Sequence, residues 1–116
     1  MSGEFDRVLM HHMLDHSRKA VELLTLREQS DGPDDQIAEL ALSKLLTMIG
    51  SAAERVSETT KDQYPDIPWK SAVEIKYFLI ERFDEVDLEL VMDLASKQAP
   101  TLINHLEREL EEGDGE

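Results

Sequence analysis

The feature that most constrains the fold of this chain is a series of apolar residues spaced for one face of a helix. Between residues 34 and 61 the series reads Leu42, Leu45, Leu46, Ile49, Ala53 and Val56. A helix returns to the same face at intervals of three, four or seven residues, whereas a strand alternates at every second residue. Because no strand-like alternation occurs in the sequence, we expect an all-α fold.

Four further segments have helical spacing, and short connections separate them. They cover residues 4–28, 68–83, 88–98 and 102–110, with Pro100 expected to separate the last two. Asp34 or Asp35 is the expected cap of the helix over residues 34–61, and Asp87 the cap of the helix that begins at Leu88. The sequence predicts an up-down bundle of four to five helices in one domain, residues 1–110, and a disordered acidic tail, residues 111–116.

Gly50 lies inside the most strongly patterned of these helices. A glycine there costs about 1 kcal/mol relative to alanine, so its presence needs a reason. Ala52 and Ala53 are also small. We therefore expect another helix to cross closely at Gly50.

The segment after Pro68 has an unusual surface for a short helix. Plotted at about 100° per residue, its apolar stripe includes Ile80 and Phe83 and carries Lys76 near the middle. Ile75 and Phe78 form a second apolar patch. This patch predicts burial against a second copy in a homodimer, or a central position in the chain's own bundle; the sequence leaves both open.

The charge and the residue types exclude several classes of site. The chain has 26 acidic and 12 basic residues, a net charge of −14, and no cysteine. The absence of cysteine rules out disulfides, thiolate metal sites and a cysteine nucleophile. The negative field disfavours the binding of RNA, although a local basic site would permit it. The negative charge is explained more easily by a basic protein partner or by a simple contribution to solubility.

No membrane association, metal site or cofactor is expected. No apolar run is long enough to span a bilayer, and the first residues do not resemble a signal peptide, so we expect a cytoplasmic protein. His12 and His16 are four residues apart and could chelate a metal from one side of a helix. Two imidazoles without a fixed third ligand make a weak site, and we interpret them as solvated.

Several short motifs occur in a characteristic order. They are Ile49-Gly50-Ser51-Ala52-Ala53, Tyr64-Pro65-Asp66-Ile67-Pro68-Trp69, Asp84-Glu85-Val86-Asp87 and Ala99-Pro100. Together with the leucine spacing they resemble the HepT-like branch of the HEPN superfamily, from about Met10 to Leu110. The segment Ile-Gly-x-Ala-Ala followed at this distance by Tyr-Pro-x-Ile-Pro-Trp is the most specific part of the resemblance.

The resemblance implies a two-fold homodimer, a toxin–antitoxin system and a minimal nucleotidyltransferase as the antitoxin partner. It also implies a metal-independent ribonuclease site of the pattern Arg-Asn-x-x-x-His-x-Tyr, whose tyrosine is adenylylated in some members. The matching positions here carry Lys76, Tyr77, Glu81 and Phe83, and Ser51 replaces the family's usual glutamate.

Each substitution removes part of the implied chemistry. Lys76 keeps the positive charge but not the two-pronged guanidinium. Glu81 cannot serve as an acid at neutral pH unless its pKa is strongly raised. Phe83 has no hydroxyl to donate or to be modified. The sequence therefore predicts a degenerate ribonuclease homologue that acts through dimerisation and partner binding.

Two alternatives stay open at this point. One is an active ribonuclease toxin whose site has been rebuilt from Lys76 and Glu81, either at a distorted helix end or across the dimer. The other is a helical adaptor with no toxin–antitoxin role, because a fold does not determine a function.

Overall fold

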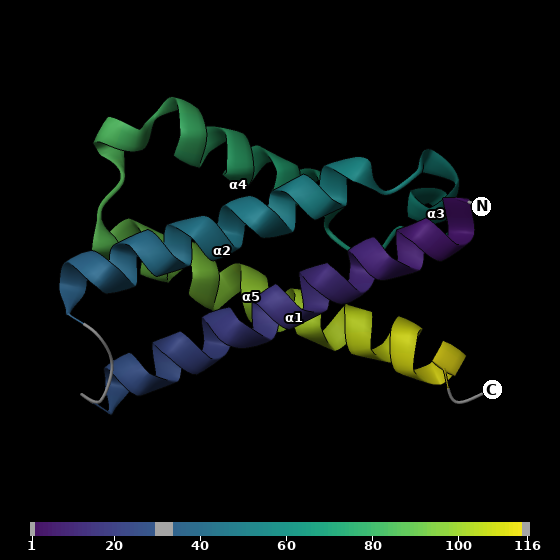
Figure 1. The fold of residues 1–116 in the computed structure, drawn as a ribbon, viewed down its shortest axis with the longest axis horizontal. Helices are drawn as coiled ribbons and strands as arrows, with labels where there is room; N and C mark the ends of the chain where they lie inside the picture. Colours follow the sequence, from purple (N-terminus) through teal and green to yellow (C-terminus); the bar gives the residue numbers. More distant parts are fainter. Residues whose placement is uncertain (1, 30–33, 115–116) are drawn as a thin grey trace.

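The computed structural model describes residues 2–29 and 34–114, and this part of the chain consists of helices and short connections without a strand (Figure 1). The elements are α1 (Ser2–Glu28), α2 (Asp35–Arg55), α3 (Glu58–Gln63), α4 (Trp69–Glu81), the 3₁₀ helix η1 (Phe83–Glu85) and α5 (Leu88–Asp114). The prediction of an all-α fold is confirmed.

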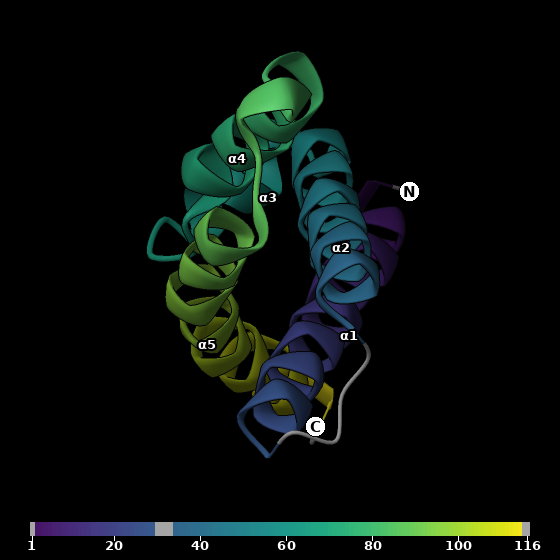
Figure 2. The ribbon, with the colours of Figure 1, turned by 90° about the vertical axis from the view of Figure 1, so that its left-hand side faces the viewer.

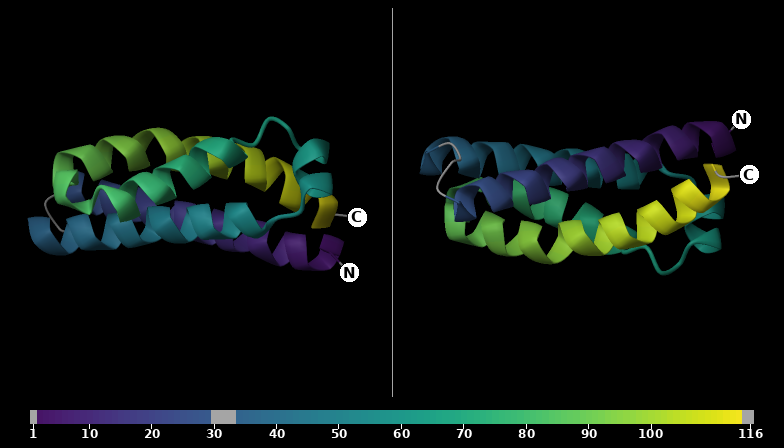
Figure 3. Two further views of the ribbon diagram at one scale, coloured as in Figure 1. Left: turned by 90° about the horizontal axis from the view of Figure 1, so that it is seen from above. Right: turned by 90° about the horizontal axis from the view of Figure 1, so that it is seen from below.

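The four long helices run up and down, and α2 is the central one. It contacts α1, α4 and α5, whereas α4 packs chiefly on α2. Seen end-on, the long helices surround a common interior (Figure 2), and both ends of the described chain lie at the same end of the bundle (Figure 3). Because α4 has one main neighbour, much of its surface is left uncovered.

The core consists of the apolar stripes predicted from the helical spacing. Its fully buried large side chains come from α1, α2 and α5: Leu9, Met13, Leu42, Leu46, Ile49, Val91, Leu102, Leu106 and Leu110. α4 adds Trp69, Ala72 and Leu79. None of the described helices is both long enough and apolar enough to cross a membrane.

At Gly50 the backbone of α2 lies so close to α4 that no side chain would fit between the two helices. A Cβ atom on Gly50 would lie 2.4 Å from Cβ of Lys76 and 2.6 Å from the carbonyl oxygen of Ala72. Real Cβ atoms do not come this close to such atoms, so the crossing requires a residue without a side chain. The predicted close crossing at Gly50 is confirmed.

The predicted end of the second helix is wrong, and a hydroxyl explains why. α2 ends at Arg55 rather than near residue 61, because Val56 is extended and Ser57 starts α3. The Ser57 hydroxyl accepts a hydrogen bond from the Thr60 amide at 3.3 Å. The predicted caps are confirmed: Asp34 accepts from the Ile37 amide, and Asp87 from the Leu90 amide.

The predicted break at Pro100 is also wrong, since α5 is one helix through this residue. Proline removes a helical hydrogen bond, which costs about 3 kcal/mol in a helix interior. Pro100 is exposed, while Ala95, Ala99 and Leu102 are buried on either side of it. Packing of the continuous stripe therefore outweighs the local cost.

The tail predicted over residues 111–116 is only partly described. α5 extends beyond Leu110 to Asp114, and residues 115–116 lie outside the described part of the chain. The disorder predicted for the tail stays a prediction there.

A buried carboxylate joins the start of α1 to α3. Asp6 accepts hydrogen bonds from the Ser57 amide at 3.1 Å, the Ser57 hydroxyl at 2.6 Å and the Thr60 hydroxyl at 2.6 Å. Burial raises the pKa of Asp6, but these three hydrogen bonds outweigh burial and hold the pKa below its usual value. Asp6 therefore stabilises the fold as an anion.

The lowered pKa of Asp6 predicts a pH-dependent contribution to stability. A carboxyl whose pKa is lower when folded stabilises fully above its unfolded pKa, near 3.9, and loses that effect as pH falls through the folded pKa. We expect Asp6→Asn to lower the free energy of unfolding by about 1–3 kcal/mol at pH 7. Urea unfolding should show a smaller difference between the two proteins at acid pH.

The exposed Asp62 of α3 provides the matched control. Asp62→Asn should change the free energy of unfolding by less than about 0.5 kcal/mol. An Asp6→Asn effect that is equal at pH 7 and at acid pH would contradict the assignment to the carboxylate charge.

Candidate functional site

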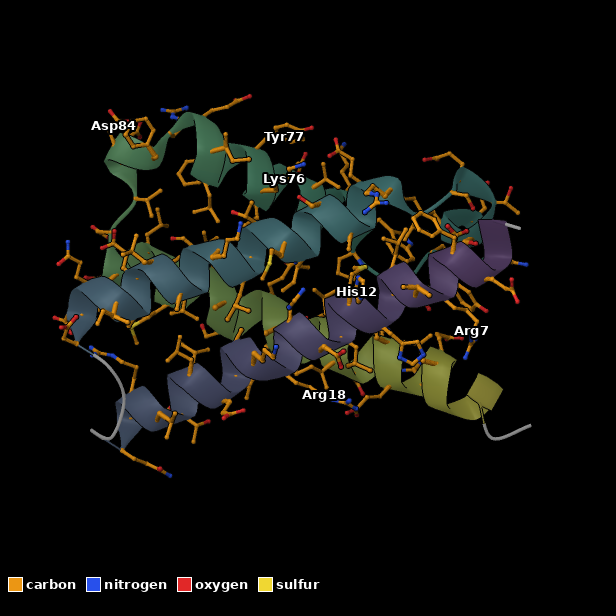
Figure 4. All side chains as sticks on the ribbon, viewed as in Figure 1. Arg7, His12, Arg18, Lys76, Tyr77 and Asp84 are labelled. Carbon is orange, nitrogen blue, oxygen red and sulfur yellow. The ribbon has the colours of Figure 1, made fainter. Side chains whose placement is uncertain are left out.

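Lys76 and Tyr77 of α4 meet at a single carboxylate of α2. The Lys76 ammonium lies 2.7 Å from Oε1 of Glu54, and the Tyr77 hydroxyl donates to Oε2 of Glu54 at 2.5 Å. The Lys76 nitrogen also lies 4.9 Å from the centre of the Tyr77 ring. Figure 4 shows the two side chains together on α4. All three groups form one compact ionic cluster.

The helix geometry explains how these residues meet. Gly50 brings α4 against α2 at Lys76, and Glu54 lies one turn further along α2. Side chains tilt toward the N-terminus of their own helix. Since α4 runs opposite to α2, Lys76 and Tyr77 reach back toward the C-terminal part of α2, where Glu54 lies.

The hydrogen bonds shift the proton equilibria of all three groups. The bonds from Lys76 and Tyr77 lower the pKa of Glu54, and the bond to Glu54 raises the pKa of Lys76. The hydrogen bond to Glu54, followed by desolvation, raises the pKa of Tyr77. At neutral pH the cluster therefore holds a carboxylate, an ammonium and a protonated phenol.

Glu81 and Phe83 do not join this cluster. Both are exposed, Phe83 with 75% of its surface accessible at the start of η1. In the described part of the chain no hydrogen bond or ion pair joins Glu81 to Lys76; Glu81 only adds a small electrostatic contribution at Tyr77. Of the four motif positions, the structure brings together Lys76 and Tyr77.

The surface of α4 differs from the predicted pattern. Ile75 and Phe78, for which the sequence left open burial by a second copy or by the chain's own bundle, are half-buried and pack against the chain's own core; their contact with a second copy stays a prediction. Ile80 was placed on the buried stripe, but half of its surface is accessible, as is most of Phe83. The reason is that α4 has only α2 as a main neighbour. Fewer of the apolar side chains near the end of α4 are therefore buried.

A hollow of about 730 Å³ adjoins the cluster at Glu54. The proline-rich connection before α4 forms part of its wall. The other lining side chains include Trp69, the cations Lys61 and Lys70, and the carboxylates Glu58 and Glu74. The Trp69 indole donates to the Tyr64 carbonyl at 3.0 Å, which fixes this connection. The Tyr-Pro-x-Ile-Pro-Trp motif thus forms the border of the site.

The histidine pair does not develop into a metal centre. His12 and His16 have ring centroids 6.4 Å apart, and His12 lies on α1, a different helix from the cluster (Figure 4). No group of three or more metal-ligating side chains occurs within residues 2–29 and 34–114. Desolvation lowers the pKa of His16, which favours the neutral ring.

Glu54 is the member of this cluster that the sequence patterns missed. It lies 22 positions from Lys76, and nothing in the helical spacing pairs the two. One signal was available: Ser51 occupies the position of the glutamate typical of the resembling family, and Glu54 follows one turn later on the same helix. Glu54 follows Ser51 by three positions, so the two residues lie near each other on the surface of α2.

Comparisons with known proteins agree with the sequence motifs. Residues 10–109 match the family described as Ribonuclease HepT-like. "Putative RNase MJ0127" of Methanocaldococcus jannaschii is 21% identical, the match covering 95% of this chain and 91% of that protein. "Putative RNase MJ1380" of the same organism is 19% identical over 92% and 98%.

A third relative has an additional activity in its name. "Gamma-glutamylcyclotransferase and putative RNase MJ0434", also of Methanocaldococcus jannaschii, is 24% identical over 93% of this chain but only 49% of its own length. No solved structure matches the chain.

Proposed function

We propose, from the premise that this chain belongs to the HepT-like ribonuclease family, that it is a catalytically degenerate member which acts by association. It would pair with a second copy of itself and bind a minimal nucleotidyltransferase as part of a toxin–antitoxin system. RNA cleavage would not be part of its function.

The observation that carries this proposal is the state of the four motif positions. The cation at the arginine position, Lys76, is held by Glu54 at 2.7 Å. The position of the imidazole carries Glu81, an exposed carboxylate that would repel a phosphodiester. Phe83 supplies no hydroxyl. Neither a free phosphate-binding cation nor an imidazole is present at these positions.

The surface of α4 supports association. Ile80 near the end of α4, a helix with one main neighbour, and Phe83 at the start of η1 both expose much of their apolar surface. Contiguous exposed apolar side chains are typical of protein interfaces. We propose that a second copy covers this end of α4, with the half-buried Ile75 and Phe78 adding to the contact, and that the nucleotidyltransferase binds the assembled dimer.

One preparation of the purified protein tests both parts of the proposal. Incubated with tRNA and with total RNA, it should produce no fragments beyond those of a protein-free sample, because the motif lacks its acid–base group. Light scattering on the same sample should give the mass of a dimer. Lys76→Ala and Glu81→Ala serve as the comparison variants in the RNA assay.

The outcomes separate the competing functions. Cleavage by the wild-type protein that disappears in Lys76→Ala or Glu81→Ala would establish an active, rebuilt ribonuclease and refute the proposal. A monomer that does not bind the nucleotidyltransferase encoded beside it, or a gene with no such neighbour, would favour a helical adaptor instead.

A further inference from the structure

We infer that the outer side of α1 and α2 is a second self-association surface, on which two copies of this chain pair with their α2 helices antiparallel. The surface, called the α1/α2 face, consists of Phe5, Val8, Ile37, Leu40, Lys44 and Arg55. The proposed function already places one contact between copies at the end of α4. Resting on that proposal, the α1/α2 face would join two dimers into a tetramer.

Exposed apolar side chains form one pair at each end of this face. Phe5 and Val8 of α1, and Ile37 and Leu40 of α2, each expose between 47% and 64% of their surface. The guanidinium of Arg55 lies 5.0 Å from the centre of the Phe5 ring, so the first pair lies beside the end of α2. Ile37 precedes Arg55 by 18 residues, which is five full helical turns. Ile37 therefore lies on the same side of α2 as Arg55, about 27 Å away along the helix.

Both pairs lie on one broad side of the molecule. α1 and α2 pack on each other, and Figure 2 shows them along one side of the bundle, with α4 and α5 along the other. The α1/α2 face is therefore built from different helices than the exposed end of α4. Apolar side chains gathered on one side in this way are typical of a protein interface.

The charge of this face is what suits it to a second copy. Each chain has a net charge of −14, so two copies repel each other unless the surfaces in contact carry few carboxylates. From Leu40 to Ala53 α2 has no carboxylate, and its one charged residue there is Lys44. α1 adds one exposed carboxylate to this side, Asp15, with the exposed Lys19 one turn further along.

The spacing of the two apolar pairs favours an antiparallel arrangement. A two-fold contact uses the same surface on both copies, so one end of the face must match the other. With the α2 helices antiparallel, Ile37 of one copy lies against Phe5 and Arg55 of the second copy. Leu40, one turn further along α2, then lies against the second copy's Val8, one turn further along α1.

A parallel arrangement would lose this match. It would place Lys44 opposite Lys44 and Arg55 opposite Arg55, and juxtaposed like charges oppose association. Antiparallel helices also place the opposite ends of their dipoles side by side. The polar residues between the two apolar pairs, such as Lys44 and Ser51, make this a weak contact. We therefore expect dimers in dilute solution and tetramers as the protein concentration rises.

Sedimentation equilibrium over a range of protein concentrations tests the surface. Leu40→Glu places a carboxylate against an apolar partner, so it should weaken the association of dimers at least about tenfold. Asn104→Glu, at an exposed position of α5, adds the same charge on another side and should leave the association unchanged. Circular dichroism checks folding, and Val8→Glu replaces Leu40→Glu if that variant is unfolded.

Disulfide cross-linking tests the direction of the two helices, because the chain has no cysteine of its own. In Ile37→Cys/Arg55→Cys the two thiols of one chain are about 27 Å apart along α2, too far for a disulfide within the chain. Oxidation should therefore link two chains, as seen on a non-reducing gel. Ile37→Cys alone and Arg55→Cys alone should stay unlinked, because antiparallel pairing places identical residues at opposite ends. Linking by either single variant would refute the antiparallel arrangement.

The outcomes keep this inference separate from the proposed function. A wild-type protein that stays dimeric at every concentration would refute the α1/α2 contact and leave the proposed dimer intact. Equal weakening by Asn104→Glu and Leu40→Glu would assign the effect to net charge and also refute the α1/α2 contact. Pairing that is lost in Leu40→Glu but kept in Ile80→Glu would support the α1/α2 contact and refute the contact at the end of α4.

Discussion

Leu42→Ala is expected to lower the free energy of unfolding by about 2–5 kcal/mol, the largest effect of the substitutions considered for this protein. Leu42 is 0% exposed and lies on α2, the helix that contacts α1, α4 and α5. Truncation removes apolar contacts in the core and leaves a cavity there. Denaturant unfolding followed by circular dichroism measures the loss.

Leu40 provides a matched control on the same helix. It is 64% exposed, so Leu40→Ala removes no buried surface of comparable size. Its free energy of unfolding should stay within about 0.5 kcal/mol of the wild type. Equal losses for Leu40→Ala and Leu42→Ala would contradict the placement of α2 at the centre of the bundle.

Gly50→Ala should destabilise the protein by about 2 kcal/mol, although alanine is the better helix former. Overpacking costs about 1–3 kcal/mol, and the upper end applies because both obstructing atoms, Cβ of Lys76 and the carbonyl oxygen of Ala72, are rigid. The gain in helix propensity offsets about 1 kcal/mol of that cost. Denaturant unfolding measures the difference.

Gly3 is the corresponding control, because a Cβ there would meet nothing within 4 Å. Gly3→Ala should be neutral or stabilising by up to about 1 kcal/mol.

Gly50→Ala should also move α4 away from α2, so the nuclear magnetic resonance signals of Lys76 and Tyr77 should shift. A stabilised Gly50→Ala protein would refute the close crossing.

The sequence alone predicted most of the helices and the side chains that they bury. Leu42, Leu46 and Ile49 recur at helical intervals, and all three are buried. The caps at Asp34 and Asp87 were also predictable, because a carboxylate one residue before a helix satisfies its free amides. These features are local: each depends on residues within one or two turns.

The errors arose where distant contacts outweigh local preference. Pro100 is a helix breaker by local rules, but the buried stripe from Ala95 to Leu102 packs as one surface. The end of α2 depends on Ser57, which both caps α3 and donates to Asp6 of α1. Local periodicity contains no information about a partner 51 positions away in the chain.

The candidate site divides in the same way. The sequence determined its chemical inventory, namely which motif positions carry Lys76, Tyr77, Glu81 and Phe83, and so determined that the imidazole and the phenol are gone. Only the tertiary structure decided that Lys76 is engaged by Glu54. Helical periodicity states which face a residue occupies, whereas its partner depends on where two helices cross, and Gly50 places that crossing within reach of Glu54.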